Sequence, residues 1–321
     1  MGNTGVNELR TMKDDKKPLV SIGLPVYNGE KLISQAIESL LSQDFKDFEL
    51  IISDNASLDR TDELCKAYAE QDERIIYRRN SRNLGMAANY NKVASLARGT
   101  FFMWASHDDS WDPSYISCCI IPLLESPSVV LAYTKSLTIA RGGESCWQEY
   151  DNICTLGIKA PWERIRKVHK GAVRRTAIYG LMRRDAVMKA LPISYYRMPD
   201  HVFLVVMAIF GEFAFIPERL FTYRMQEHYV VKDGIKVHAS YQMVYETEAA
   251  NPKEFKTLFP ASLAICRRVT HEELTLSDKR HILIDTFVWY LRMEWNRRNF
   301  SKYKDVNKWK KKLRELFTYN K

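Results

Sequence analysis

The first third of the chain alternates short apolar runs with segments of helical spacing, and this alternation limits the fold more than any other feature. Four apolar runs have the length of strands, at residues 19–25, 48–53, 74–78 and 100–105. The segments between these runs repeat apolar residues every three or four positions, as residues 33–41 do. Strands that alternate with helices predict an α/β fold, with a mostly parallel central sheet and helices on both faces.

Polar pairs stand at the ends of three of these predicted strands. They are Tyr27-Asn28 after the first strand, Asp54-Asn55 after the second and Asp108-Asp109 after the fourth. The carboxyl ends of parallel strands meet at one edge of a sheet, and ligands of such sheets bind there. We therefore expect a single site at this edge.

Asp108 and Asp109 are adjacent carboxylates directly after an apolar run. Such a pair can hold a hard divalent cation that keeps several waters and bridges phosphate oxygens. A cation there would neutralise the charge that builds on a leaving diphosphate. The alternative is a solvated turn, because Asp-Asp is also common in turns and at helix starts.

Asp54 and Asn55 can hydrogen-bond the edge of a nucleobase or a ribose hydroxyl. The alternative is an Asx turn that leads into the helix around Leu64, with Ser57 or Asp59 as its cap. The two interpretations are compatible, since loops at strand ends carry binding groups on a rigid scaffold.

Beyond residue 126 the alternation loosens. Residues 202–210 predict a buried helix that Gly211 ends, and residues 213–217 predict a short strand. No internal repeat or low-complexity linker separates the parts of the chain. We divide it into a polar tail (1–17), a first half (18–125), a second half (126–230) and a helical, basic C-terminal region (231–321).

The net charge of +9 is compatible with nucleic acid, an anionic membrane or phosphorylated small molecules as partners. The six cysteines form no CxxC pair and no metal-type spacing with histidine, as is typical of a reduced, cytoplasmic protein. No segment has the features of a signal peptide or the length of a spanning helix. We expect a protein that is soluble or lies on a membrane surface.

The C-terminus carries an apolar stripe between basic residues. Its members recur at three- and four-residue steps: Val306, Trp309, Leu313, Leu316 and Phe317. Lysines crowd the flanks, so a helix of this kind can lie on an anionic membrane. The alternative is that the stripe packs on the body of the protein and the lysines are solvated.

A series of motifs in the same order resembles the family 2 inverting glycosyltransferases. The matching segments are residues 20–29 (opening strand and loop), 41–52 ("LxQ…xEiiv"), 53–61 ("vDDgSxDxT"), 83–85 and 97–99 (before the metal motif), 107–109 (in place of DxD) and 198–204 ("EDxxL"). Five motifs in order over about a hundred residues are far more specific than any one of them.

The resemblance implies a GT-A fold, a nucleotide-sugar donor and Mg²⁺ or Mn²⁺ as cofactor. It assigns to the nucleotide Pro25, Tyr27, Asn28, Asp54, Asn55, Asn83 and Asp108. It implies a metal site formed by Asp108, Asp109 and His228, and contact of Arg224 with the diphosphate. Asp200 would be the general base that takes the proton of the acceptor hydroxyl. Residues 18–125 would then bind the donor, and residues 126–230 the acceptor.

Three positions depart from the family pattern. His107 replaces the first acid of DxD, so that metal binding depends on Asp108 and Asp109. Asn55 replaces the second acid of "DDgS", and Pro199 replaces the acid before Asp200.

The predicted function is transfer of a sugar, with inversion, from a nucleoside-diphosphate donor to a hydroxyl acceptor. The resemblance favours UDP as the nucleotide and a saccharide or lipid-linked acceptor in surface polysaccharide or cell-envelope glycan synthesis. We expect a cytoplasmic protein, with peripheral contact to the inner face of the membrane as a further expectation, and no nucleic acid partner. The alternatives are a non-catalytic nucleotide-sugar-binding protein and a nucleotidyltransferase-like enzyme. The turn from Gly23 to Gly29 lacks G-x-G-x-x-G, and no Walker A motif is present, which argues against dehydrogenases and P-loop enzymes.

Overall fold

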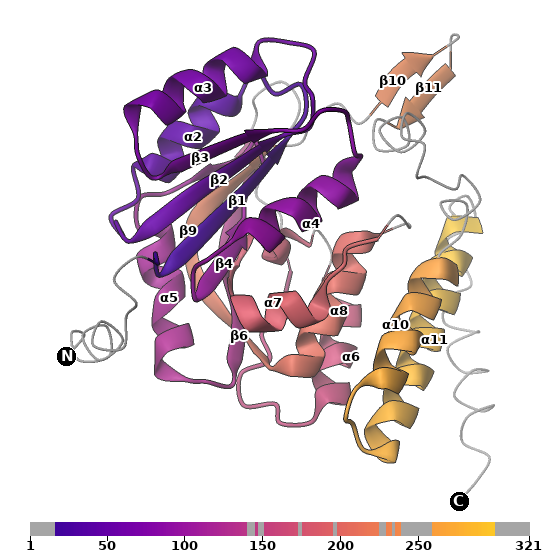
Figure 1. Cartoon of the computed structure of the whole chain (residues 1–321). Coiled ribbons are helices and arrows are strands. Elements are labelled where there is room, and N and C mark those ends of the chain that lie inside the picture. Colours follow the sequence, from indigo (N-terminus) through magenta and orange to yellow (C-terminus); the bar gives the residue numbers. More distant parts are fainter. Residues whose placement is uncertain are drawn as a thin grey trace, which may run out of the picture.

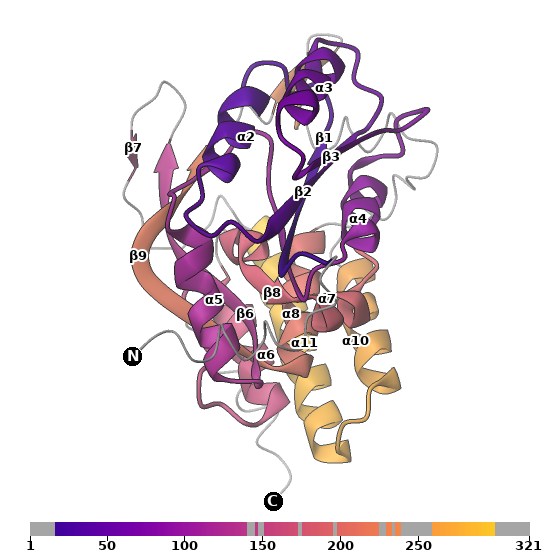
Figure 2. The same ribbon diagram turned by 60° about the vertical axis from the view of Figure 1, so that its left-hand side comes forward.

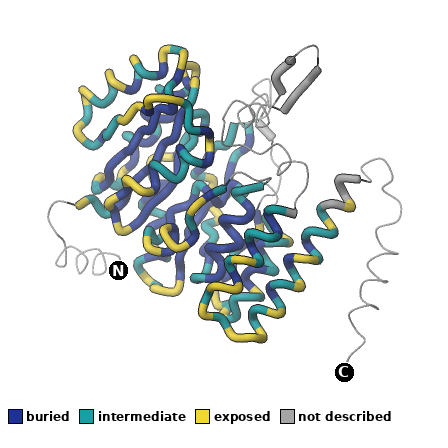
Figure 3. The backbone as a smooth tube through the Cα atoms, turned by 45° about the vertical axis from the view of Figure 1, so that its right-hand side comes forward, coloured by how far each residue is buried: buried dark blue, intermediate teal, exposed yellow. Residues whose placement is uncertain are grey.

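The computed structural model of the chain describes residues 17–139, 145–146, 151–172, 175–194, 198–224, 229–232, 235–238 and 259–298. A central sheet separates two groups of helices, and a pair of C-terminal helices lies beside one of these groups (Figure 1, Figure 2). Most strand residues of the central sheet are buried, whereas the outer faces of the helices are exposed (Figure 3). The predicted α/β fold with helices on both faces of the sheet is confirmed.

The first half of the sheet is parallel, in the order β3-β2-β1-β4. Its strands are β1 (Val20–Val26), β2 (Phe48–Asp54), β3 (Ile75–Arg79) and β4 (Phe101–Trp104). The helices that connect them are α2 (Ile33–Leu41), α3 (Thr61–Gln71) and α4 (Met86–Leu96). Every residue of β1, β2 and β4 is buried, as is typical of parallel strands covered on both faces. The four strands predicted from the sequence are confirmed.

The second half of the sheet mixes strand directions. β8 (Leu181–Arg183) joins β4 antiparallel, and beyond it β6 (Val129–Ile139) runs parallel to β9 (Glu212–Arg224). β5 (Ser110–Trp111) pairs with β9, and β7 (Ser145–Cys146) pairs with the end of β6. The helical segments are α5 (Tyr115–Glu125), α6 (Pro161–Gly171), the 3₁₀ turn η1 (Thr176–Tyr179), α7 (Arg184–Ala190) and α8 (Pro199–Phe210).

Two apolar cores lie on the two faces of the sheet. Ile22 and Leu24 of β1 belong to the core under α2, α3 and α5. The other core lies between the sheet and α4, α6, α7 and α8. A Cβ on Gly23 would come within 2.9 Å of Phe102 and Val93 on this second side. Glycine at this position therefore lets α4 pack closely against β1.

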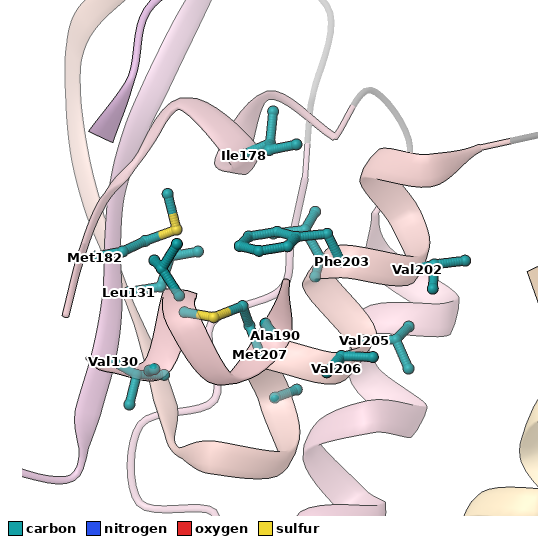
Figure 4. Packing of buried hydrophobic residues seen from close by; sticks show 14 of the residues in the cluster. Val130, Leu131, Ile178, Met182, Ala190, Val202, Phe203, Val205, Val206 and Met207 are labelled. Atoms are coloured by element: carbon teal, nitrogen blue, oxygen red, sulfur yellow. The ribbon is translucent and has the colours of Figure 1, made fainter. Parts of the chain in front are cut away.

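The burial of α8 fixes the position of its first turn. Every residue from His201 to Ile209 is buried, and Phe203 points from α8 toward Leu131 and Met182 (Figure 4). Gly211 ends the helix where a Cβ would lie 2.4 Å from Val130 Cγ1. The predicted buried helix, glycine stop and following strand are confirmed.

The C-terminal region differs from the continuous helical stretch expected from residue 231. β10 (Tyr229–Lys232) and β11 (Ile235–His238) form an antiparallel pair before the helices α10 (Phe259–His271) and α11 (Leu276–Arg298). The physical reason is readable in the sequence, because Asp-Gly between two runs rich in β-branched residues is typical of a two-residue hairpin. No helix within the described ranges is long and apolar enough to cross a membrane.

Candidate active site

The loops that follow β1 and β2 are hydrogen-bonded to each other. The Asn28 N–H donates to Ser57 Oγ at 2.9 Å, and Asn28 Oδ1 accepts from the Leu58 N–H at 2.8 Å. The Gly29 N–H donates to Thr61 Oγ1 at 2.8 Å. Asn28 adopts a φ of 52°, in the left-handed region that asparagine tolerates better than most residues. These bonds hold the two strand-end loops as one surface.

Asp54 supports this surface from inside. It is fully buried, and its carboxylate accepts from the Ser57 N–H at 2.9 Å, Tyr77 Oη at 3.0 Å and Arg79 Nη1 at 2.8 Å. Arg79 Nη2 also donates to the Ser57 carbonyl at 2.9 Å. The predicted site residue is therefore at the strand end, with its oxygens engaged inside the protein.

Asn55 organises the next loop, between β3 and α4. Its Nδ2 donates to Asn83 Oδ1 at 2.6 Å, and its Oδ1 accepts from Asn80 Nδ2 and the Leu84 N–H, both at 2.9 Å. The Asn83 oxygen also accepts from the Gly85 N–H at 2.8 Å. This network needs a donor as well as an acceptor at position 55, which an ionised carboxylate cannot supply.

Pro25 and Tyr27 lie beside these loops. Pro25 is buried and pairs in register with Ser53, and Tyr27 is half-buried directly after β1. The Asn55 N–H donates to the Val26 carbonyl at 2.8 Å. The structure therefore places Pro25, Tyr27 and Asn55 around the ends of β1 and β2, as expected from the sequence.

The acid pair follows β4 at the same edge. The Ala105 N–H donates to the Gly23 carbonyl at 2.9 Å, which holds this segment against β1. Asp108 is half-buried and accepts from Ser106 Oγ. Asp109 is 1% exposed, and burial followed by the negative charge of Asp108 raises the pKa of Asp109 well above its usual value. Its Oδ2 is buried and has no hydrogen-bond partner in the described part of the chain.

β9 brings Arg224 to the acid pair. The pairing of Trp111 with Phe221 aligns the start of β5 with the end of β9. As a result, the Arg224 N–H donates to Asp109 Oδ1 at 2.8 Å, and Arg224 Nη2 donates to Gln35 Oε1 at 3.0 Å. Asp109 and Arg224, predicted from distant parts of the sequence, are thus in direct contact.

His107 packs against the first loop. A Cβ on Gly29 would lie 2.9 Å from His107 Cδ2. Glycine at position 29 therefore lets the segment after β4 approach the loop after β1.

Asp200 lies in the first turn of α8 and belongs to residues 126–230, the half predicted to bind the acceptor. Its Oδ2 accepts from Arg175 Nε at 2.6 Å, and its Oδ1 accepts from the His201 N–H at 2.8 Å. One turn along α8, Phe203 makes an edge contact with Trp104 at the end of β4, with ring centroids 4.9 Å apart. This contact ties the first turn of α8 to the strand that carries the acid pair.

Tyr90 connects the acid pair electrostatically with Asp200. Its pKa is raised, first by burial and then by the negative charges of Asp108, Asp109 and Asp200. The Tyr90 carbonyl accepts from Trp104 Nε1 at 3.1 Å. The negative charges of all three carboxylates therefore act on the Tyr90 hydroxyl.

The chemistry of the acid pair fits a divalent cation. Mg²⁺ commonly takes one or two carboxylates from the protein and completes its shell with water and phosphate oxygens. Asp108 and Asp109 can supply two such carboxylates, and across the described residues no group of three His, Cys, Asp or Glu side chains is arranged to hold a metal. His228, the third predicted ligand, lies outside the described residues.

Several residues around the predicted site residues belong to no sequence motif. Arg175 and Asp151 belong to no motif, and Gln35 lies on α2, far from Arg224 in the chain. Only the folded chain brings them to the predicted residues.

The fold and the site define a class, namely α/β proteins that bind ligands at the carboxyl edge of a parallel sheet beside a pair of acids. Residues 21–188, more than half of the chain, match the family model described as glycosyl transferase family 2. The chain belongs to this family, and its fold is of the GT-A type.

Relatives of known name agree with the family. An uncharacterized glycosyltransferase of Methanocaldococcus jannaschii is 41% identical over 95 residues, 29% of this chain and 33% of that protein. The putative colanic acid biosynthesis glycosyl transferase WcaA of Escherichia coli is 36% identical over 100 residues, 31% of this chain and 36% of that protein. The chain thus spans about a third of the length of these curated relatives.

A solved structure shows the same fold. The crystal structure of S. aureus TarS 1-349 in complex with UDP-GlcNAc has a TM-score of 0.61 and 16% identity, covering 85% of this chain and 72% of that one. At this identity the likeness concerns the fold.

Proposed function

We propose that the protein transfers one sugar, with inversion, from a nucleoside-diphosphate donor to a hydroxyl of a saccharide or lipid-linked acceptor. The observation that carries this proposal is the acid pair Asp108-Asp109 after β4, at the carboxyl edge of the parallel sheet and with Arg224 bonded to Asp109, in a chain of this family. The acid pair stands at the edge of the sheet where such folds bind ligands, and Asp200 lies in the first turn of α8, which Phe203 ties to the end of β4.

The comparisons support a UDP-sugar as donor and polysaccharide synthesis as the setting. TarS was solved with UDP-GlcNAc, and relatives are named for colanic acid biosynthesis and as a chondroitin synthase. A product for surface polysaccharide or cell-envelope glycan is consistent with these names.

We assign the nucleotide to the surface formed by the first three strand-end loops. Tyr27 and Asn28 would contact the base and ribose directly, together with Asn83. Asp54 and Asn55 would act by holding the loops, since their side chains are engaged within the protein. Asp108 would lie between the ribose and the diphosphate, and Arg224 would approach the diphosphate from β9.

Asp108 and Asp109 would hold Mg²⁺ or Mn²⁺. The buried, unpartnered Oδ2 of Asp109 supports this, because a buried carboxylate oxygen without a partner is unfavourable unless a cation or proton completes it. A bound cation would supply Lewis-acid stabilisation of the departing diphosphate.

Asp200 would accept the proton of the acceptor hydroxyl as its oxygen forms a bond to the anomeric carbon. In the same step the bond from that carbon to the diphosphate breaks, and the nucleoside diphosphate leaves with the electron pair. A single displacement of this kind inverts the anomeric configuration. The proton leaves the hydroxyl only as the new bond forms, so a carboxylate is a sufficient base.

A donor panel tests the proposal. The full chain is incubated with UDP-glucose, UDP-galactose, UDP-N-acetylglucosamine or GDP-mannose, in the presence of Mn²⁺ or of excess EDTA. Release of the nucleoside diphosphate is followed by mass spectrometry. We expect the nucleoside diphosphate to be released from at least one donor with Mn²⁺, and no release in excess EDTA. Binding of donors without any release would support the non-catalytic alternative, and formation of a nucleotide sugar from a nucleoside triphosphate and a sugar phosphate would support the nucleotidyltransferase alternative.

We also propose peripheral contact with the inner face of a membrane, through α11 and the basic residues that follow it. Ile284, Phe287 and Trp295 on α11 are 38%, 51% and 38% exposed, and they recur at helical spacing on one side. Arg280 and Arg292 are exposed on the same helix. Exposed apolar and aromatic side chains can enter the headgroup boundary while neighbouring arginines meet anionic lipid. The stripe from Val306 to Phe317 lies outside the described residues.

A further inference from the structure

Asp200 is held by a charged partner that its motif does not contain. Arg175 Nε donates to Asp200 Oδ2 at 2.6 Å, and the two side chains are 25% and 30% exposed. A charge-assisted hydrogen bond of this kind is roughly twice as strong as a neutral one. Because both side chains are largely covered, water screens the pair only in part. Arg175 therefore restrains the carboxylate that we assign as the base.

The second oxygen of Asp200 is fixed by its own helix. Asp200 follows Pro199 at the start of α8, and its Oδ1 accepts from the His201 N–H at 2.8 Å. The positive end of the helix dipole favours a carboxylate at this place. Each carboxylate oxygen has a second lone pair, so the group is oriented and can still accept a proton.

Arg175 is itself fixed by a buried carboxylate. Asp151 is 2% exposed, and it accepts from the Arg175 N–H at 2.9 Å and from Thr176 Oγ1 at 3.0 Å. Arg175 has a φ of 60°, a left-handed backbone that is unfavourable for arginine and persists where the surroundings enforce it. Asp151 thus sets the backbone from which the guanidinium reaches Asp200.

We propose that Arg175 is the positioning residue of the base, held by Asp151 and acting through Asp200. This inference rests on the proposed function of Asp200. Arginine suits the task because it does not lose its proton, and its rigid planar group fixes the direction of the bond it donates. Asp151 holds Arg175, and Arg175 in turn orients the Asp200 carboxylate for the acceptor hydroxyl. A 1 Å misplacement of such a group can cost roughly 100-fold in rate.

The test uses Arg175→Ala and Arg175→Lys, assayed with the donor of the panel on which the full-length wild type is most active. Arg166→Ala is the matched control, because it removes an Arg–Asp pair of 2.9 Å that joins α6 to Asp285 of α11 and does not involve Asp200. We expect Arg175→Ala to lower kcat roughly 100-fold while the donor KM changes less than about twofold. Added guanidinium ion should restore part of the loss, Arg175→Lys should retain more activity, and Arg166→Ala should match the wild type.

A double variant shows whether Arg175 acts through Asp200. In the Asp200→Asn background, Arg175→Ala should cost no further activity, because residues that act as a unit are not additive. Unchanged kcat in Arg175→Ala, or an equal loss in both backgrounds, would overturn the inference and leave the proposed function standing. A wild type that releases diphosphate from no donor of the panel would overturn the proposed function, and this role with it.

Discussion

Asn55 stands where the family motif has an acid, and its contacts explain the amide. Its Nδ2 donates to Asn83 while its Oδ1 accepts from Asn80 and Leu84. The sequence indicated only that Asn55 replaces an acid of the family motif. The structure adds that the loop after β3 depends on a donor at this position.

Asn55→Asp should therefore destabilise the protein. The change places two acceptor oxygens face to face at the 2.6 Å contact with Asn83 and puts a charge at a position that is 2% exposed. We expect a loss of about 1–3 kcal/mol in the free energy of unfolding, measured by urea denaturation at neutral pH. The matched control is Asn83→Asp, which keeps the accepting oxygen and should lose much less. Equal losses in the two variants would contradict this account of Asn55.

At the scale of single residues, the sequence predicted the candidate site residues but not the residues that hold them in place. Asp109 was predicted as one of two adjacent acids after an apolar run, and Asp200 was predicted from the resemblance to the family. Asp151 and Arg175 belong to no pattern, and their roles depend on the left-handed turn at Arg175 and on its distance to Asp200. Such contacts join residues that local spacing cannot relate.

Among the elements, α6, α8 and α11 meet in a histidine cluster behind Asp200. His169 Nδ1 lies 3.0 Å from His201 Nε2, and the His201 ring stacks on Trp289 with centroids 4.5 Å apart. Burial lowers the pKa of His169 to about 3 and that of His201 well below its usual value. Both rings are therefore neutral in the folded protein at neutral pH.

This cluster predicts that stability falls in mild acid. The unfolded chain binds protons at histidine near pH 6.5, whereas the folded chain keeps His169 neutral down to about pH 3. The stabilisation is complete above pH 6.5 and is lost as the pH falls toward 3, at about 1.4 kcal/mol per pH unit for each histidine. Urea denaturation between about pH 7.5 and 5.5 measures the slope. His169→Gln should make the free energy of unfolding depend less steeply on pH, because the variant lacks the contribution of one histidine. The same pH dependence in the variant and the wild type would contradict the prediction.

The elements of the first half could be predicted because each strand and helix buries residues close together in the chain. The ends of β1 to β4 lie within one residue of the ends of the predicted apolar runs. The pairing of β9 with β6 and β5 could not be predicted, because long-range register depends on the packed sheet. The contact of Arg224 with Asp109 follows from that register. The hairpin β10–β11 was missed although Asp-Gly marked it.

For the whole molecule, α11 and the basic residues after it predict binding to anionic vesicles. Co-sedimentation of the full chain should be strong with vesicles of phosphatidylcholine and phosphatidylglycerol at low salt, and weak with phosphatidylcholine alone. Phe287→Ser combined with Trp295→Ser should reduce binding, since these side chains are exposed on α11. Truncation before Ser301 should reduce it as well, because it removes the lysines.

Ile121→Ser is the control, since Ile121 is 51% exposed on α5, an element on the other side of the sheet. Equal sedimentation of all variants would contradict the membrane proposal. It would also be contradicted if Phe287→Ser with Trp295→Ser changed only the oligomeric state, measured by size-exclusion chromatography with light scattering.

The central claim, that the acid pair Asp108-Asp109 and Asp200 together perform sugar transfer, is tested most directly by Asp200→Asn. The variant keeps the shape of the side chain and removes its capacity to accept a proton. With the preferred donor and Mn²⁺, kcat should fall by roughly 10²–10⁴-fold, while the affinity for the nucleoside diphosphate, measured by calorimetry, should stay close to that of the wild type. If diphosphate binding collapses and kcat at saturating donor survives, Asp200 belongs to the donor site and the account is wrong.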